Sequence, residues 1–323
     1  MTPNGSHSFG LLDEMRIRFD GRVVVITGAG SGLGKSYALH LAERGARVVV
    51  NDRGGNVEGS GESNVPAQFV ADEITRAGGE AVANFDDVSQ VAGANNLINQ
   101  ALDHFGTVDV LICNAGILRD KSFSKMSLED FELVLRVHLL GTVYVTKAAF
   151  PVMKDKRYGR IVVTTSASGL YGNFGQTNYG AAKLGIVGFM NSLKLEGLKY
   201  NICINAVAPL AATRLASGVF PEDIASRLKP ELVTPVVAYL CSEQCEASGD
   251  IISAGAGSYR VVRIVESKGV RFGAEEEITP EMIAAKYRDI SNLEGATPFS
   301  DAQEEFASVL MPLVKDGVTN GSV

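Results

Sequence analysis

Short runs of β-branched residues alternate with longer amphipathic segments along most of the chain. The runs are continuously apolar, which is typical of strands buried on both faces of a parallel sheet. We expect such strands over residues 22–26, 47–50, 81–85, 108–112, 159–164 and 202–207. The intervening segments predict helices over residues 32–45, 68–77, 92–105 and 127–153, and a further helix that begins near residue 178. Because strands alternate with helices, the pattern predicts a three-layer α/β fold with a doubly wound parallel sheet.

The alternation ends near residue 257, and this change divides the chain. We expect an N-terminal tail over residues 1–15, an α/β domain over 16–256 and a small C-terminal extension over 257–323. Within the extension, the pattern predicts a strand or hairpin over 259–272 and helices over 279–290 and 300–313. Thr279 followed by Pro280 is a good helix start, because threonine caps the first turn and proline suits its first position.

The acidic composition narrows the range of partners. The 323 residues carry a formal charge of -7 and the basic residues are scattered, so nucleic acids and anionic membrane surfaces would repel the chain. The four cysteines are too few and too irregular for a disulfide framework, and no metal-ligand set accompanies them. The N-terminus lacks the pattern of a signal peptide, and no apolar run reaches the roughly 18 residues of a membrane span. We therefore expect reduced thiols, no metal and a soluble cytoplasmic protein.

A glycine-rich turn joins the first predicted strand to the first predicted helix. Glycine lets the backbone turn tightly and approach a diphosphate, while a helix N-terminus offers unpaired N–H groups and the positive end of the helix dipole. This placement predicts the dinucleotide site of a Rossmann fold. The residues expected to contact the dinucleotide here are Gly28, Ser31, Gly32, Leu33 and Gly34.

Residues at the ends of later strands extend this predicted site. Asp52 ends the second strand, where a carboxylate can accept both ribose hydroxyls of the adenosine and would repel a 2′-phosphate. This favours NAD over NADP. Arg53 is the opposing feature, because a cation there could bind that phosphate; we favour the alternative that it is a solvated residue of a long surface loop over 53–66. Asp87 and Val88 are expected near the adenine, and Asn114, Ala115 and Gly116 are expected to leave room for the cofactor.

Ser166, Tyr179 and Lys183 form the most specific constellation in the chain. Tyr179 and Lys183 are four residues apart, so on a helix both project from one face. A free phenol is a poor base at neutral pH, but an adjacent ammonium together with the positive nicotinamide favours the phenolate. Tyr179 could then accept the proton of an alcohol while hydride leaves for a nicotinamide, and Ser166 could hold the substrate oxygen. Tyr179 and Lys183 are also expected to contact the cofactor.

These motifs make the chain resemble the short-chain dehydrogenase/reductase family. Residues 27–34 match its TGxxxGxG motif, 114–116 its Asn-Ala-Gly and 179–183 its YxxxK, and Ser166 has the usual spacing. The match covers roughly residues 20–255. Within the family, the chain is most similar to the (3R)-hydroxyacyl-CoA dehydrogenase unit of multifunctional β-oxidation enzymes. The residues that indicate this are 50–52, 114–120, 137–139 and 166–176.

The resemblance implies NAD, a homodimer and a 3-hydroxyacyl-CoA thioester as the small-molecule substrate. It also implies that the extension packs on the domain or near a partner subunit's active site. Hydroxysteroid dehydrogenases share much of the pattern, so a steroid or steroid-CoA alcohol stays open as a substrate. A catalytically silent dinucleotide-binding sensor is a weaker alternative, because Ser166, Tyr179 and Lys183 are all intact.

The chain departs from the family pattern at two positions that bear on the site. His138 stands where most members have an asparagine that holds a water relay to the lysine; the histidine could continue the relay through its backbone, or it could be a packed side chain. After the sixth strand the usual Pro-Gly is Pro209-Leu210, and we expect Ala211 and Thr213 to meet the nicotinamide end. The loop over 211–228 is expected to cover the pocket. No hydratase region follows, which implies a stand-alone dehydrogenase.

Overall fold

The computed structural model describes residues 16–214, 221–273 and 275–319, with the backbone alone for residues 312–319. The predicted N-terminal tail, residues 1–15, and part of the predicted covering loop, residues 215–220, lie outside the described residues. The chain divides into two compact units, Met1–Val261 and Val262–Val323. The division comes a few residues after the predicted one because the last strand belongs to the sheet of the first unit.

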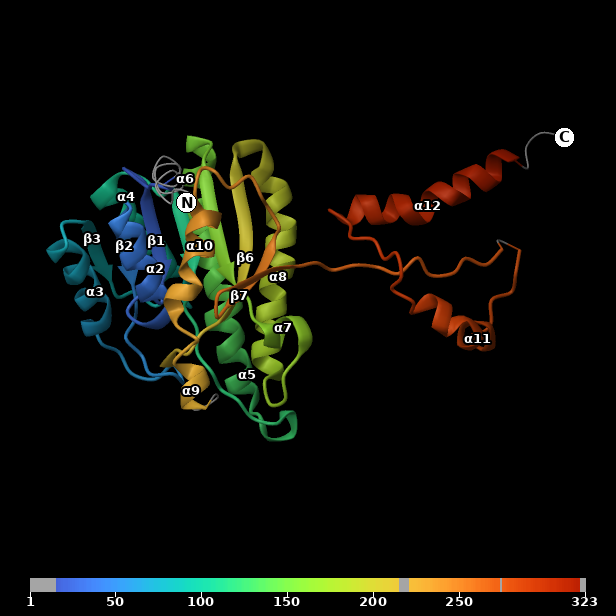
Figure 1. The fold of residues 1–323 in the computed structure, drawn as a ribbon, viewed down its shortest axis with the longest axis horizontal. Coiled ribbons are helices and arrows are strands. Elements are labelled where there is room, and N and C mark those ends of the chain that lie inside the picture. Colours follow the sequence, from blue (N-terminus) through green and yellow to red (C-terminus); the bar gives the residue numbers. More distant parts are fainter. Residues whose placement is uncertain (1–15, 215–220, 274, 320–323) are drawn as a thin grey trace, which may run out of the picture. The chain divides into compact units, whose positions relative to one another are not determined.

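One sheet organises the first unit, and the described residues contribute eight strands to it in the order β3-β2-β1-β4-β5-β6-β7-β8 (Figure 1). Every pairing from β3 across to β7 is parallel. The strands are β1 (Val23–Thr27), β2 (Arg47–Asn51), β3 (Glu80–Asn84), β4 (Val110–Cys113), β5 (Gly159–Thr164), β6 (Ile202–Leu210), β7 (Ile251–Gly255) and β8 (Ser258–Val262). The predicted doubly wound parallel sheet is confirmed. The strand order reverses between β1 and β4, and ligands of such sheets bind at the carboxyl ends beside that reversal.

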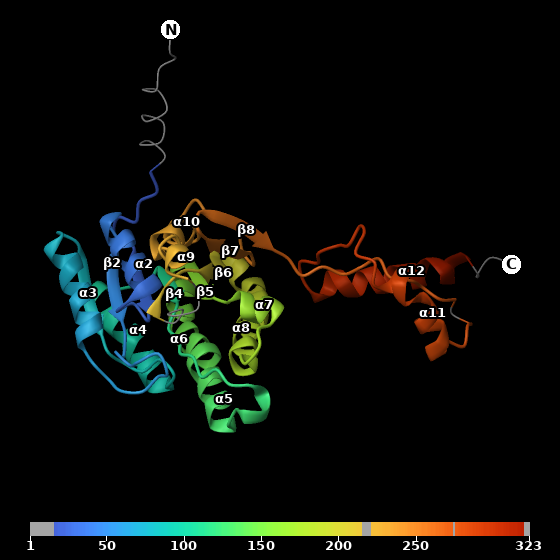
Figure 2. The same ribbon diagram turned by 60° about the horizontal axis from the view of Figure 1, so that its bottom comes forward.

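Helices cover both faces of the sheet (Figure 2). On one face α10 and α3 pack against α2, and on the other α4 and α8 pack against α6. The helices are α2 (Gly32–Glu43), α3 (Val65–Arg76), α4 (Val91–Phe105), α5 (Leu128–Leu135), α6 (Gly141–Lys156), α7 (Ala167–Tyr171), α8 (Thr177–Gly197), α9 (Glu222–Ala225) and α10 (Thr234–Cys241). Short 3-10 turns lie at Phe123–Lys125, Leu198–Tyr200 and Pro230–Leu232. The side chains of β1 and β5 are wholly buried between the two layers, which explains why their sequences lack polar alternation.

The helix predicted over 127–153 is interrupted. Ser127 caps its start by accepting a hydrogen bond from the Asp130 N–H at 3.1 Å. A π-helical turn, η2 (Arg136–Leu140), then separates α5 from α6. Such single π turns occur frequently at functional sites. The sequence pattern did not reveal the turn, because the buried residues Val134, His138, Thr142 and Thr146 follow at a four-residue spacing that an ordinary α-helix also gives.

The sheet edge also differs from the prediction. The strand or hairpin expected over 259–272 is reduced to β8, whose hairpin partner is β7. Ala256 and Gly257 join the two strands with φ of 49° and 76°, the signature of a two-residue type I′ turn. The pattern had not assigned β7 or α10, because short apolar runs do not distinguish strand from helix.

The second unit contains the two helices that the sequence predicted. Helix α11 spans Pro280–Ile290, and Thr279 caps it by accepting from the Met282 N–H at 3.4 Å. Helix α12 spans Ala302–Thr319. An isolated antiparallel bridge joins Glu266 to Thr297. Many apolar side chains of this unit are exposed, among them Ile264, Tyr287, Phe306, Val309 and Leu310.

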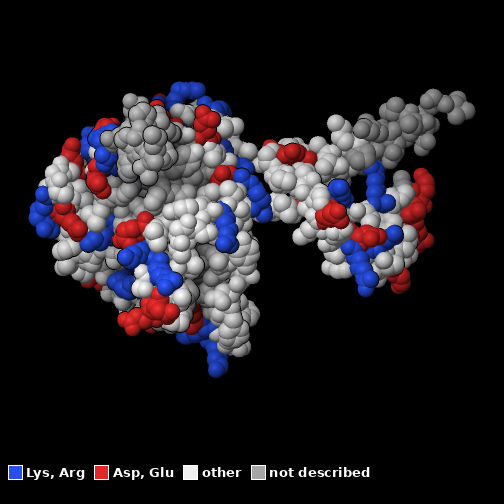
Figure 3. All heavy atoms as spheres, viewed as in Figure 1, with Lys and Arg blue, Asp and Glu red and all other residues white. Residues whose placement is uncertain are grey.

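Charged side chains of both signs are interspersed over the face of the first unit that Figure 3 shows. The continuous helical stretch Leu128–Lys156 is 29 residues long with a mean hydropathy of 1.3, so by length and composition it is the one helix among the described residues that could cross a membrane. Its residues His138, Thr142 and Thr146 are buried, and it packs against α4 and α8. In this fold the stretch is part of a layer that covers the sheet.

Candidate active site

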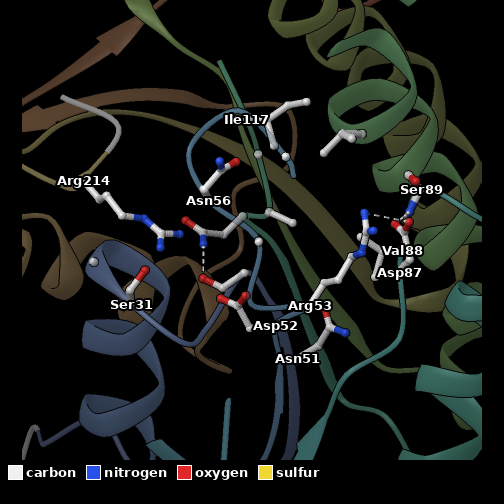
Figure 4. Close-up of a pocket in the computed structure, with 18 of the residues that line it drawn as sticks. Ser31, Asn51, Asp52, Arg53, Asn56, Asp87, Val88, Ser89, Ile117 and Arg214 are labelled. Atoms are coloured by element: carbon white, nitrogen blue, oxygen red, sulfur yellow. Dashed lines mark hydrogen bonds and ion pairs between the residues drawn. The ribbon is translucent and has the colours of Figure 1, made fainter. Parts of the chain in front are cut away.

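A cavity of about 350 Å³ opens at the carboxyl ends of the strands around the point where the strand order reverses (Figure 4). Its walls come from the ends of β1, β2, β3 and β4 and from the turn η2. Of the residues predicted to bind the cofactor, the following line it: Gly28, Ser31, Gly32, Leu33, Asp52, Asp87, Val88, Asn114, Ala115, Gly116 and Thr213. Most of the residues predicted to bind the cofactor therefore line this cavity.

The glycine turn forms the floor of the cavity beside the start of α2. Gly28 has φ of 64°, and a Cβ there would lie 2.7 Å from the Ala115 Cα, so only glycine fits this close approach. Gly34 has a different role from the predicted one: it does not line the cavity, and a Cβ there would lie 2.3 Å from the Gly28 carbonyl oxygen. Gly34 thus lets the helix pack onto the turn, whereas Gly28 and Gly32 face the cavity.

Asp52 is oriented by backbone hydrogen bonds. Its Oδ2 accepts from the Gly30 N–H at 2.9 Å and its Oδ1 from the Gly54 N–H at 2.7 Å. A carboxylate oxygen has more than one acceptor position, so these bonds hold Asp52 against the glycine turn and leave it able to accept from a ligand in the cavity. The residue is in the predicted place at the end of β2.

Asn114 connects β4 to the glycine turn. Its side-chain amide donates to the carbonyl oxygens of Thr27 and Gly28 at 3.1 and 3.0 Å, and its own N–H donates to Thr27 Oγ1 at 3.0 Å. These bonds fix the separation of the two strand ends between which the cavity opens. Asn114 is therefore a structural part of the cavity as well as part of its lining.

Tyr179 and Ser166 lie together next to this wall. Ser166 follows β5 and caps α7, and Tyr179 lies in the first turn of α8. Burial raises the pKa of Tyr179 above its usual value, and a hydrogen bond with Ser166 opposes the rise. The expected phenolate depends on the positive nicotinamide as well as on Lys183, and in the protein chain by itself burial sets the direction of the shift in the pKa of Tyr179.

Lys183 is buried beneath Tyr179. Its Nζ lies 5.5 Å from the centre of the Tyr179 ring and donates to the Thr164 carbonyl oxygen at 2.7 Å. Its own carbonyl oxygen accepts from Thr165 Oγ1, also at 2.7 Å, so both ends of the residue are tied to the end of β5. Only 3% of its surface is exposed, and burial lowers the pKa of Lys183 to about 7. The ammonium and the neutral amine are consequently both populated near neutral pH.

His138 is a packed side chain in the π-helical turn. Its Nε2 lies 2.8 Å from the Ile117 carbonyl oxygen and 3.0 Å from the Ile117 nitrogen, and its ring meets the Tyr179 ring edge-on at 5.1 Å. Burial and the Lys183 charge lower the pKa of His138 well below its usual value, so the ring is neutral. A Cβ on Gly116 would lie 2.2 Å from the ring. The His138 carbonyl oxygen accepts from Thr142 Oγ1 at 2.7 Å.

The cavity also has lining residues beyond the predicted cofactor contacts. Arg214 projects from the segment after β6, and its guanidinium is directed toward the side of the cavity where Asn56 and Ser31 lie (Figure 4). Arg53, Asn56, Ile117 and Arg136 also line the wall. Conversely, Ala211, Tyr179 and Lys183 are not part of its lining, and Ala211 is buried in the core.

The other chemical features are unremarkable. All four cysteines are free and buried in the described part of the chain. Within the described ranges, no group of three or more histidine, cysteine, aspartate or glutamate side chains is arranged to hold a metal ion.

Comparison with known proteins explains this arrangement. The model of the short chain dehydrogenase family matches residues 22–220. A short-chain type dehydrogenase/reductase of Mycobacterium tuberculosis is 50% identical over 275 residues, which are 85% of this chain and 96% of that protein. This chain belongs to the short-chain dehydrogenase family. It is accordingly an oxidoreductase that acts on CH–OH groups, and the alternative of a catalytically silent sensor is set aside.

Solved structures with a similar fold include the following two. The full-length peroxisomal multifunctional enzyme type 2 of Drosophila melanogaster matches with a TM-score of 0.78 at 40% identity over 93% of this chain. This chain spans about half of that enzyme, 50% of its length. A 7α-hydroxysteroid dehydrogenase complexed with NADH and 7-oxo glycochenodeoxycholic acid matches with a TM-score of 0.67 at 28% identity, over 74% of this chain and 95% of that one. The family context thus makes the cavity a site for a nicotinamide dinucleotide.

Proposed function

We propose that this chain is an NAD-dependent dehydrogenase that oxidises the secondary alcohol of a 3-hydroxyacyl-CoA, or reduces the corresponding ketone. The observation that carries the proposal is the cluster of Ser166, Tyr179 and Lys183 at the carboxyl ends of the sheet, beside a cavity whose floor is a glycine turn. The acyl-CoA part of the proposal is supported by resemblance to the multifunctional enzyme type 2, and the oxidoreductase part by family membership.

The residues that line the cavity fit NAD. Gly28 and Gly116 allow the backbone of the cavity wall to pack closely against Ala115 and His138, since a Cβ at either position would lie within 2.7 Å of those residues. The start of α2 presents N–H groups to the diphosphate, and Arg214 adds a cation on the same side of the cavity. Asp52 suits the ribose hydroxyls of the adenosine. When bound, the oxidised nicotinamide supplies the acceptor for hydride.

The side chains of the site manage the proton. Loss of hydride from the carbinol carbon yields a carbonyl only if the hydroxyl proton also leaves, and Tyr179 Oη would accept that proton as the phenolate, the form that the Lys183 ammonium and the positive nicotinamide favour. Ser166 Oγ, which hydrogen-bonds Tyr179, holds the substrate oxygen beside it. Lys183, with a pKa of about 7, exchanges protons near neutral pH and provides positive charge beneath the phenol.

A hydroxysteroid or steroid-CoA is the second candidate substrate. It is favoured by the similarity to the 7α-hydroxysteroid dehydrogenase, whose fold this chain shares over 74% of its length. An assay of NADH formation across 3-hydroxyacyl-CoAs of graded length, with hydroxysteroids alongside, separates the two. Turnover of steroids alone would reject the acyl-CoA assignment.

We further propose a homodimer in the cytoplasm, with the second unit packed on the first unit or near the active site of a partner. The exposed apolar side chains of the second unit support a packing role, because their burial would be favourable. The four buried free thiols suit a reducing compartment.

The proton-transfer role is tested with Tyr179→Phe, which removes only the hydroxyl. We expect the variant to bind NADH with unchanged affinity while turnover falls by about 10³-fold, the range of a lost general base. Stopped assays of ketone reduction and fluorescence titration with NADH measure the two quantities. A variant that retains turnover would remove Tyr179 from its proposed role.

A further inference from the structure

Arg53 follows Asp52 directly and lines the same side of the cavity (Figure 4). A cation in this position is placed to bind the 2′-phosphate of NADP, which conflicts with the preference that Asp52 confers. Its guanidinium, however, forms two ion pairs: one with Glu62 at 2.9 Å and one with Asp87 at 3.4 Å. We refer to these three side chains as the Arg53 cluster.

The loop after β2 is folded so that Glu62 returns to Arg53. The Ser63 N–H donates to the Arg53 carbonyl oxygen at 3.0 Å, which aligns the two ends of the loop. Asn56 fixes the turn between them, because its Oδ1 accepts from the N–H groups of Glu58 and Ser60 at 3.1 and 2.8 Å. The Glu62 carboxylate is therefore held opposite Arg53 by the backbone of the loop.

The far side of the loop is fastened to the segment after β4. The Leu118 N–H donates to the Val57 carbonyl oxygen at 3.0 Å, and Arg119 Nε donates to the Glu58 carbonyl oxygen at 2.7 Å. Gly59 approaches the Ile117 side chain so closely that a Cβ there would lie 3.0 Å from it. Because the loop is tied both at its base and at its middle, its backbone brings Glu62 next to Arg53.

Asp87 supplies the second fixed partner. It follows β3, and its Oδ1 accepts from the Ser89 N–H at 2.9 Å, which leaves Oδ2 for Arg53. The guanidinium thus spans from the loop after β2 to the segment after β3, with carboxylates on both sides. Asp52, Asp86 and Asp87 bring three carboxylates into the cavity lining beside Arg53, and Glu62 adds a fourth outside the lining through its ion pair with Arg53.

We propose that Glu62 and Asp87 hold Arg53 away from the ribose of the cofactor, and that this ion-paired arrangement, together with Asp52, determines the preference for the dinucleotide without a 2′-phosphate. A 2′-phosphate would have to displace two carboxylates from Arg53 and would approach an excess of negative charge. The inference rests on the proposed NAD-dependent function and names the residues that set its cofactor selectivity.

The test compares the dissociation constants of NADH and NADPH, measured by nucleotide fluorescence in the full-length protein. Glu62→Gln keeps the side chain's shape and removes its charge, and the residue's side chain is 74% exposed, so folding is not at risk. We expect its NADPH affinity to rise about fivefold relative to NADH, which corresponds to roughly 1 kcal/mol, the upper range for an exposed ion pair. In Glu62→Gln/Arg53→Gln, that gain should disappear.

Glu58→Gln is the matched control, because it makes the same charge change in the same loop and should leave the ratio unaltered. An unchanged ratio in Glu62→Gln would overturn the inference. So would an equal gain in Glu58→Gln, or a gain that persists without Arg53, because either would indicate a general charge effect. If the wild-type protein bound neither nucleotide, the proposed function would be rejected as well. If the protein bound NADH but Glu62→Gln left the ratio of the NADPH and NADH dissociation constants unchanged, only the selectivity inference would be rejected.

Discussion

Replacing Lys183 with methionine should make the protein more stable at neutral pH while removing its activity. The Lys183 side chain is buried with only 3% of its surface exposed, and burial lowers its pKa from 10.5 to about 7. Between pH 7 and pH 10.5, Lys183 is protonated in the unfolded chain but mostly neutral in the folded chain. The cost of burying Lys183 is therefore fully present below pH 7 and disappears as the pH rises toward 10.5.

The magnitude follows from the pKa difference. One pKa unit corresponds to about 1.4 kcal/mol, so the cost is about 4 kcal/mol at pH 7 and about 2 kcal/mol at pH 9. Methionine avoids this cost but leaves the Thr164 carbonyl oxygen without the Nζ donor, at an expense of about 1–3 kcal/mol that does not vary with pH. We expect a net gain of about 1–3 kcal/mol at pH 7 for Lys183→Met, which shrinks by about 2 kcal/mol between pH 7 and pH 9.

Urea unfolding followed by circular dichroism measures this difference, at one protein concentration for both proteins and both pH values. The chain has no tryptophan, so secondary structure is the more direct signal. The pH dependence is the critical observation, because a purely structural effect of the substitution would give a constant offset. An offset that stays constant from pH 7 to pH 9 would refute the reasoning that Lys183 is buried with a lowered pKa.

Three other predictions concern the cavity wall, the base of the sheet and the second unit. Gly116→Ala should lower kcat/KM about 100-fold, because its Cβ would lie 2.2 Å from the buried His138 ring. Gly188→Ala is the control, because a Cβ there meets nothing within 4 Å, and an equal loss of kcat/KM in both variants would contradict the argument. Asp109→Asn should lower the free energy of unfolding by about 2–3 kcal/mol, since fully buried Asp109 pairs with Arg22 and Lys156; an unchanged urea midpoint would contradict this. A chain that ends at Val262 should sediment as a monomer or show a raised KM for acyl-CoA. An unaltered oligomeric state together with unaltered kinetics would reject the packing role of the second unit.

The sequence predicted those parts of the site that depend on local spacing. The glycine turn, Asp52 and the Asn114–Gly116 segment are defined by their position at strand ends, and all three line the cavity. The pattern could not predict Arg214 or Arg136 as lining residues, because their approach depends on how distant segments pack. For Gly34, the motif alone did not distinguish a ligand contact from a packing contact with the turn.

Electrostatic properties were the hardest to predict. The rise in the pKa of Tyr179 and the fall in that of Lys183 both result from burial, which depends on the assembled layers rather than on the four-residue spacing. The partners of Arg53 were likewise hidden, because Glu62 lies nine residues later and returns only through the folded loop. The fold itself was more readily predicted, since alternating strand and helix periods are strong signals.

The π-helical turn at Arg136–Leu140 changes the angular phase of the helix that contains it. A turn with i→i+5 hydrogen bonds holds one residue more than an α-helical turn, which rotates everything after it by about 100°. Residues before and after the turn therefore present their inward faces mainly to different neighbours: α5 packs on α8, whereas α6 packs chiefly on α4 and only slightly on α8. A one-residue deletion here would restore regular α-helical hydrogen bonding but would turn one half of the helix away from its neighbours. The extra residue therefore lets a single helix line the cavity along one part and pack in the core along the other.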